Sequence, residues 1–208
     1  MINRRAFAGL LMLAQTMFLP AMAQDAPPAM NRDPMAIRAG NYVLDPQHGK
    51  ITWAVTHVGL SLYQGQFTNL SGKLTIDPAN LDRTSLQIEI PVDGLRANEP
   101  ELDQHLRTPD FLDMAKFPTA SFTATKVERV GERGGRVRGN LTLHGITKPV
   151  TLRVNFNAAG VHPVSKRYTL GFDGHTTIRR SQFGIVTMVP AVGDEVKLDL
   201  EGEFQLVE

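Results

Sequence analysis

Apolar and polar residues alternate along most of the chain beyond residue 41. In the segment 196–206, hydrophobic side chains and one glycine occupy every second position, and charged or amide side chains occupy the positions between them. Successive side chains of a strand point to opposite faces, so this period of two predicts a strand with one buried face. The same period recurs over 51–55, 86–92, 137–143, 150–156 and 168–178.

These segments predict an all-β fold of about eight long antiparallel strands. A sandwich of two sheets and a closed barrel both satisfy the pattern. We favour an extended, closed eight-stranded barrel, because the predicted strands exceed the usual length of about five or six residues and closure removes their exposed edges. The apolar phase slips by one position between Phe67 and Leu70, which predicts a β-bulge near 68–71.

One segment departs from the alternation and reads DQHLRTPDFLDMAKFP from Asp103. Asn98, with Glu101 three residues later, has the pattern of a capping box, so a short helical insert is predicted between strands. We expect this insert to pack on one end of the barrel, covering or gating it. His105 and Arg107 are expected to hold it in place rather than to perform chemistry.

Three glycines fall in the apolar phase of their strands, namely Gly139, Gly174 and Gly202. Glycine also serves at barrel corners, where it permits bending. Three together predict an interior that is not completely filled, and a barrel of eight strands is about the size that holds one small ligand. The predicted ligand-binding wall consists of inward-facing residues, namely Trp53, Val55, His57, Phe67, Ile88, Phe122, Leu141, Leu143, Leu152, Val154, Leu170, Phe172, Leu198 and Leu200.

His57 shares the phase of Trp53 and Val55, so its imidazole is predicted to face the apolar interior. Two interpretations stay open, a core histidine held by a neighbouring polar group and a polar contact for the head of a ligand. A lipid-modifying enzyme would use His57 as acid or base, assisted by Tyr63 or Arg180, if these groups converge beside a cavity. A haem or metal site has the least support, because no second histidine stands two or four positions away.

The first residues predict export. Arg4 and Arg5 precede an uncharged, mostly apolar run to Leu19, and a small-x-small pattern ends at Ala23. This is the pattern of a signal peptide over 1–23 with cleavage after Ala23, which predicts an exported protein. Residues 24–40 hold three prolines and no sustained period, so we expect a flexible leader there and a single barrel domain over 41–208.

Composition excludes several classes of function. The signal segment holds two of the 22 Lys and Arg residues and none of the 21 Asp and Glu residues, so the remaining chain is close to neutral. Nothing in this balance favours a nucleic acid as a partner. The chain has no cysteine, which excludes thiol catalysis and thiolate metal sites. We expect no catalytic residues, no metal and no cofactor.

Four motifs resemble the YceI-like family of polyisoprenoid-binding, lipocalin-like proteins. They are YVLDPQHGKITWAVTHVGLSLYQGQF from Tyr42, HLRTPDFLDMAKFPTASF from His105, GNLTLHGITKPVTL from Gly139 and RSQFGI from Arg180. The resemblance implies a lipocalin-like barrel with a helical insert around a long hydrophobic tunnel. It also implies a polyisoprenoid, quinone or acyl-chain lipid as ligand and a binding role without catalysis. Gln182 stands where the family often has an acidic residue.

The resulting hypothesis is an exported carrier or sequestering protein for a long-chain amphiphile held in the barrel. Burial of chain carbons supplies affinity, at about 0.8 kcal/mol for each CH₂ group. A homodimer stays open, because two barrels could pair if the flap at 179–194 exposes apolar surface. A transient contact with a membrane stays open as well.

Overall fold

The structure is a computed structural model that describes residues 29–207. Within this range the chain forms eleven strands, one α-helix and four short 3-10 helices. The strands are β1 (Gly40–Leu44), β2 (Lys50–His57), β3 (Ser61–Phe67), β4 (Ser71–Ile76), β5 (Ser85–Pro91), β6 (Leu95–Arg96), β7 (Thr119–Val130), β8 (Gly134–Leu143), β9 (Ile146–Val161), β10 (Tyr168–Arg179) and β11 (Val192–Leu206). The helices are α1 (Pro100–Leu106), η1 (Pro34–Ala36), η2 (Leu81–Arg83), η3 (Val92–Gly94) and η4 (Arg180–Phe183).

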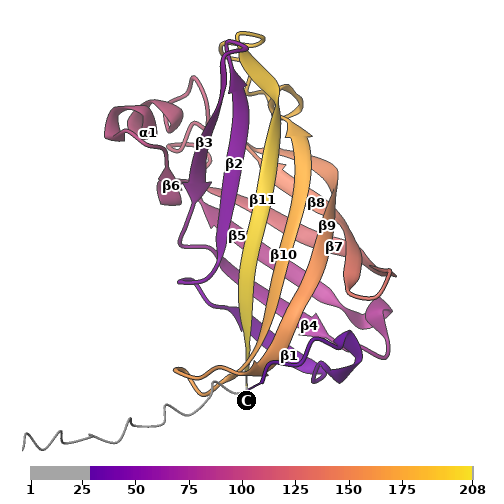
Figure 1. Ribbon diagram of the computed structural model, residues 1–208. Helices are drawn as coiled ribbons and strands as arrows, with labels where there is room; N and C mark the ends of the chain where they lie inside the picture. The colour runs from indigo at the N-terminus through magenta and orange to yellow at the C-terminus, as the bar shows by residue number, and fades with distance from the viewer. Residues whose placement is uncertain (1–28, 208) are drawn as a thin grey trace, which may run out of the picture.

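Eight strands close into an antiparallel barrel in the order β1, β4, β5, β7, β8, β9, β10 and β11 (Figure 1). The ring closes where Tyr42 on β1 lies opposite Leu206 on β11. The other half of β11 pairs with β2, where Leu198 lies opposite Trp53, and β3 and β6 continue the sheet beyond β2. The predicted closed eight-stranded barrel is confirmed.

The predicted β-bulge near 68–71 is wrong, because the chain there breaks between β3 and β4. Asn69 adopts a left-handed backbone with φ of 60°. The amide and hydroxyl of Thr68 both donate to the carbonyl of Gly94, at 3.0 and 3.1 Å. Because β3 pairs with β2 whereas β4 pairs with β1 and β5, the chain changes partners at this corner, and the apolar phase slips with it.

The helical insert lies at one end of the barrel, beside β3 and β6 (Figure 1). Its helix begins at Pro100 after Glu99, and no side chain caps it, so the predicted capping box of Asn98 is wrong. Arg107 donates to the carbonyls of Leu95, at 2.6 Å, and Asp93, at 3.2 Å, which ties the insert to η3 and β6. No helix within residues 29–207 is long and apolar enough to cross a membrane.

The segment before β1 packs against the barrel from residue 29 onward, in contrast to the flexible leader predicted over 24–40. Asn31 forms an antiparallel bridge with Ala159, with N···O distances of 2.8 and 2.7 Å. Ile37 is buried in the main core, and the Tyr168 hydroxyl donates to the carbonyl of Ala36. The predicted signal peptide lies outside the described residues.

Candidate functional site

Two apolar cavities adjoin inside the barrel. The first has a volume of about 200 Å³ and lies among β1, β4, β5 and the strands from β7 to β11. The second has a volume of about 170 Å³ and lies toward the insert, with walls from β2, β3, β6 and α1. The side chains that line both cavities, here called the waist, are Ile51, Ile90, Leu141 and Leu198.

Most of the wall predicted from the strand period lies at one of these cavities. In the first cavity these residues are Ile88, Phe122, Leu152, Val154, Phe172 and Leu200, in the second they are Trp53, Val55, Phe67 and Leu143, and Leu141 and Leu198 belong to the waist. Apolar atoms form nearly all of the lining, so the chemistry available is burial of hydrocarbon. Their contact with a ligand stays a prediction.

Two residues of the predicted wall lie elsewhere. Leu170 is fully buried in the packed core near β1 and lines neither cavity. His57 is exposed, although Val55 two positions earlier is buried. The alternation gives His57 the same phase as the buried Val55, but β2 ends at His57 and the side chain is exposed there. The prediction of an inward-facing imidazole is therefore wrong.

The three glycines differ in whether the space beside them is open or filled by a neighbouring side chain. Gly174 and Gly202 line the first cavity. A Cβ atom on Gly139 would collide with the ring of Phe122 and lie 2.5 Å from the Thr123 carbonyl oxygen. The room at Gly139 is thus filled by a neighbouring side chain, and this glycine does not enlarge the cavity.

Arg180 is buried at the second cavity and bonds only to backbone carbonyls. Its Nε donates to Gly193 at 2.9 Å, and its Nη atoms donate to Ile185 (3.1 Å), Thr187 (2.8 Å) and Val192 (2.8 Å). Burial lowers the pKa of Arg180, and the charge of Asp194 opposes that shift. The guanidinium therefore anchors the loop after η4 and the first residues of β11 through their backbone carbonyls.

Trp53 lines the second cavity and, like Arg180, carries a polar N–H group among the otherwise apolar side chains. Its indole lies over Gly65, where any side chain would collide with it, and stacks on Tyr63 with ring centroids 6.1 Å apart. Within residues 29–207, neither Trp53 Nε1 nor the Tyr63 hydroxyl has a hydrogen-bond partner, although both atoms are buried. Buried polar groups are normally paired, and of these two residues only Trp53 lines the cavity, so its Nε1 is the candidate polar contact there.

The catalytic arrangement considered from the sequence is absent from the described residues. It requires His57 beside a cavity together with Tyr63 or Arg180. His57 is exposed and lines neither cavity, and the donors of Arg180 are directed to carbonyls of its own loop.

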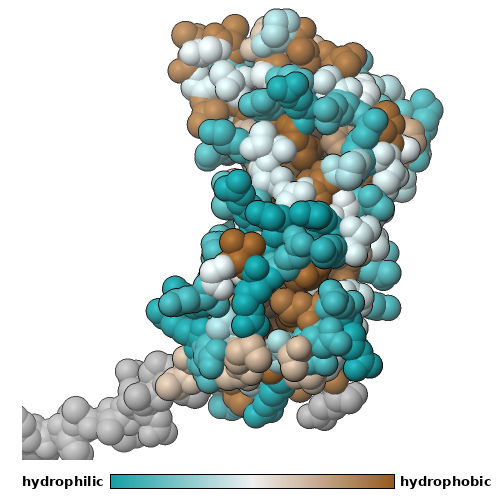
Figure 2. Space-filling view, turned by 90° about the vertical axis from the view of Figure 1, so that its right-hand side faces the viewer, coloured by the Kyte–Doolittle hydropathy of each residue, from teal (hydrophilic) through white to brown (hydrophobic). Residues whose placement is uncertain are grey.

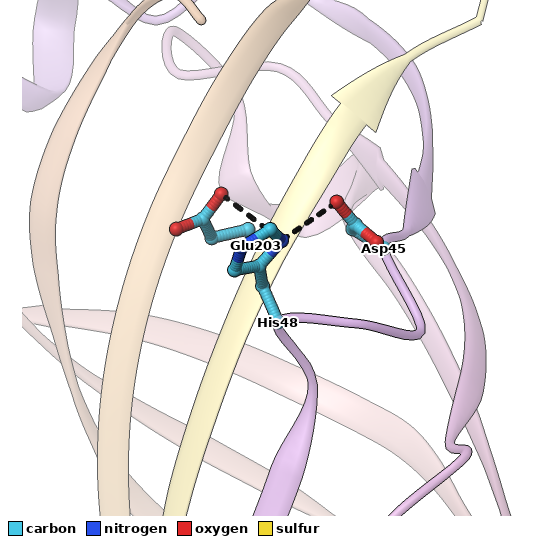
Figure 3. Close-up of side chains that lie close together, drawn as sticks. All are labelled: Asp45, His48 and Glu203. Carbon is cyan, nitrogen blue, oxygen red and sulfur yellow. Dashed lines mark hydrogen bonds and ion pairs between the residues drawn. The ribbon is translucent and has the colours of Figure 1, made fainter. Parts of the chain in front are cut away.

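One polar cluster brings three metal-type ligand atoms together in residues 29–207, from Asp45, His48 and Glu203 (Figure 3). His48 Nδ1 lies 2.8 Å from Asp45 Oδ2 and 4.0 Å from Glu203 Oε2. The carboxylate of Asp45 also accepts from Gln205 Nε2 and from the amide of Gln47. His48 Nδ1 and Asp45 Oδ2 bond to each other, so they form a hydrogen-bonded pair at the corner between β1 and β2.

The charges of this corner perturb each other. The hydrogen bond to Asp45 raises the pKa of His48 above its usual value. Burial opposes ionisation of Asp45, but hydrogen bonds from His48 and Gln47 outweigh it and hold the pKa of Asp45 below its usual range.

Strand alternation does not predict the wall residues that lie outside the strands. Among them are Leu106, Phe111, Leu112 and Ile185, which come from the insert and from the loop after η4. Strand alternation carries no information on such segments. Their apolar content within otherwise polar connections was the available signal.

Comparison with known proteins agrees with this architecture. The model of the YceI-like domain matches residues 42–204. UPF0312 proteins of Pseudomonas savastanoi and Vibrio cholerae are each 36% identical, covering 82% and 81% of this chain and 88% and 90% of theirs.

Solved structures give the same result. The Campylobacter jejuni YCEI protein has a TM-score of 0.66 at 26% identity, covering 74% of this chain and 90% of its own. Burkholderia cenocepacia BcnA has a TM-score of 0.70 at 24% identity, covering 77% and 98%. A polyisoprenoid binding domain from Saccharophagus degradans has a TM-score of 0.63 at 14% identity, covering 82% and 100%. The barrel, its two apolar cavities and the matched sequence together place this chain in the YceI-like domain family.

Proposed function

We propose that this protein binds a long-chain amphiphile, a polyisoprenoid, an isoprenoid quinone or a fatty-acyl lipid, inside the barrel. The observation that carries the proposal is the pair of apolar cavities that share the four side chains of the waist. Each CH₂ group that leaves water contributes about 0.8 kcal/mol, so an extended chain gains affinity along its length. The polyisoprenoid binding domain of Saccharophagus degradans has the same fold, which supports this class of ligand.

The chain of the ligand lies in the first cavity, and its oxygen-bearing end lies in the second. The orientation rests on Trp53, which lines the second cavity and whose buried N–H lacks a partner in residues 29–207, with the ring of Tyr63 stacked on it. A quinone carbonyl or an alcohol can accept from Trp53, which replaces His57 as the polar contact predicted from the sequence.

The physiological role follows from the ligand and the expected location. A water-insoluble chain held in a barrel can be carried, stored or sequestered outside the cytoplasm. We propose the periplasm as the compartment, because the segment 1–23 has the pattern of a signal peptide.

The test is extraction of lipid from gently purified protein, followed by mass spectrometry, and titration of stripped protein with an isoprenoid quinone. We expect a co-purified isoprenoid or acyl lipid and saturable binding. Trp53→Phe, which keeps a ring but removes the N–H, should weaken quinone binding by roughly fivefold to tenfold, the effect of one hydrogen bond. It should leave binding of an oxygen-free hydrocarbon chain unchanged.

His57→Ala serves as the matched control, because His57 lies on the same strand and is exposed. It should bind the quinone as the wild type does. A lipid-free protein that also binds no added isoprenoid or fatty acid would refute the proposed function, and equal loss of both probes in Trp53→Phe would refute the orientation.

A further inference from the structure

The end of the barrel nearest the second cavity exposes large apolar side chains. Two loops form it, the turn between β2 and β3 and the loop between η4 and β11, which lie together at the top of Figure 1. The amide of Val58 in the first loop donates to the carbonyl of Ala191 in the second at 2.8 Å. The exposed apolar side chains of these loops and of the start of β3, here called the apolar tip, are Val58, Leu60, Leu62, Val186, Met188 and Val189.

The apolar tip is exposed to an unusual degree. Leu60 is 87% exposed, more than any other large hydrophobic residue in the described range. Figure 2 shows hydrophobic residues gathered at the same upper end of the molecule. Soluble monomers rarely expose a contiguous apolar patch that has no binding role, so this end is a candidate contact surface.

The two loops of the apolar tip carry no ionic charge. No Asp, Glu, Lys or Arg occurs within 51–72 or within 181–193, although 21% of the chain consists of these residues. A surface without ions can enter the boundary between lipid headgroups and acyl chains without the large cost of removing a charge from water.

The backbone of both loops is strained at residues of the apolar tip. Val58 has φ of 50° and Met188 has φ of 62°, in the left-handed region that side chains rarely adopt. This region is especially unfavourable for a branched residue such as valine. Strain of this kind gathers at functional sites, and here the strained residues are among those that project apolar side chains into solvent.

The apolar tip is continuous with the wall of the second cavity. Val55, Ile185 and Val192 line that cavity, and each lies within three residues of a member of the tip. We propose that the apolar tip docks this end of the barrel onto the surface of a lipid bilayer, so that a chain passes between bilayer and cavity without crossing water. The transfer of a lipid chain rests on the proposed function, whereas the docking is argued only from the exposed side chains of the apolar tip.

A second copy of the chain fits the apolar tip less well than a bilayer does. Stable protein interfaces involve about 20–30 residues on each side, and six side chains on two narrow loops fall far short of that number. A bilayer needs no complementary shape, since each inserted side chain gains free energy independently.

The absence of cysteine allows a direct test of which end meets the lipid. A polarity-sensitive fluorophore is attached to Leu60→Cys and, as the matched control, to Val164→Cys. Val164 is 83% exposed in the turn between β9 and β10, at the opposite end of the barrel. With vesicles of neutral phosphatidylcholine we expect a blue shift at position 60 and none at 164. High salt should not reduce the shift, because no charge of the tip takes part.

Unlabelled variants measure the strength of docking and separate it from cargo binding. Leu60→Ser combined with Met188→Ser should bind the vesicles at least tenfold more weakly, because two large apolar side chains no longer insert. The thermal midpoint and the binding of a water-soluble, short-chain quinone should stay as in the wild type. All variants share the same N-terminal residues, so that segment cannot account for a difference between them.

Each other outcome has a defined meaning. No shift at position 60, or equal shifts at both positions, would overturn the docking of the tip. A shift at position 60 that appears without lipid and grows with protein concentration would assign the tip to a second copy instead. Quinone binding without vesicle binding would refute only the docking of the tip. Vesicle binding by a protein that holds and binds no lipid ligand would refute the proposed function.

Discussion

At the scale of single residues, the neighbours of a position decide what an inward-facing residue does. Gly139 and Gly202 both follow the apolar phase, yet only Gly202 borders a cavity. Arg180 is a charged residue at an apolar wall. Four backbone carbonyls between Ile185 and Gly193 accept its hydrogen bonds and so offset the cost of burying its charge. Asp194 supplies a nearby negative charge while it bonds to Ser181.

Gly139→Ala should reduce the free energy of unfolding by about 1–3 kcal/mol, the usual cost of forcing extra atoms into a packed region. The added Cβ would meet the Phe122 ring and a backbone carbonyl that cannot move freely. Gly202→Ala is the matched control, since its Cβ would lie 3.2 Å from the ends of Leu44 and Phe204. It should cost less than about 1 kcal/mol, because the alanine also restricts the unfolded chain. Equal costs in urea unfolding would contradict this account.

At the scale of elements, the corners between strands set the shape of the barrel. The turn between β1 and β2 is held by the ion pair of His48 and Asp45, and Glu203 on β11 lies beside it. The ring of His162, from the turn between β9 and β10, lies 6.2 Å from that of His48. This corner is one place in residues 29–207 where a change in pH acts on the fold.

The His48–Asp45 pair should stabilise the fold most between about pH 4 and pH 6.5, the ordinary pKa values of the two groups. The pKa of His48 is raised on folding, so its contribution is complete below about pH 6.5 and is lost as the pH rises through the folded value. The pKa of Asp45 is lowered, so its contribution is lost as the pH falls through the folded value.

Thermal unfolding of wild type and His48→Ala across this range measures the effect. The difference in stability should peak near pH 5–6 at less than about 1 kcal/mol, because the imidazole is partly exposed to solvent, and it should fade toward pH 9. His57→Ala, which removes an exposed imidazole that bonds to no carboxylate in the described range, should show no such peak. A difference that stays constant with pH would assign His48 a packing role only.

At the scale of the whole molecule, the waist decides whether the barrel has one long site or two short ones. Leu198 on β11 lies between the two cavities, and Leu200 on the same face borders only the first. A long chain must pass the waist, whereas a short chain can occupy one cavity alone.

Leu198→Phe should therefore limit the length of chain that the protein binds. In the wild type, affinity should rise with chain length by up to about 0.8 kcal/mol for each CH₂ group. In the variant this rise should stop at the length that fills one cavity, while the shortest probes bind as before. Leu200→Phe, the control, narrows the first cavity without closing the waist. Competition titrations with a series of chain lengths distinguish these cases, and a continued rise in Leu198→Phe would show that the chain does not cross the waist.

The sequence predicts the barrel and most of its wall because alternation is a local property. It fails where the outcome depends on distant neighbours. His57 has the phase of the buried residues of β2, but it is exposed because the core ends before it, and other strands set where the core ends. The space at Gly139 is taken by Phe122 of the adjacent strand. The carbonyls around Arg180 are brought together by a loop that has no periodic pattern, and Asn31 joins the barrel through a single bridge.

The pairing of β1 with β11 also has a consequence for how the protein forms. The ring closes only when Phe204 reaches Leu44, and these residues belong to the first and last strands of the described range. Pairing between such distant segments forms slowly, because a long loop must be closed before the contacts form. Before β11 pairs with β1, the barrel therefore has no enclosed interior. The cavities form only with this last pairing, so a ligand held inside them can be enclosed only after β11 is in place.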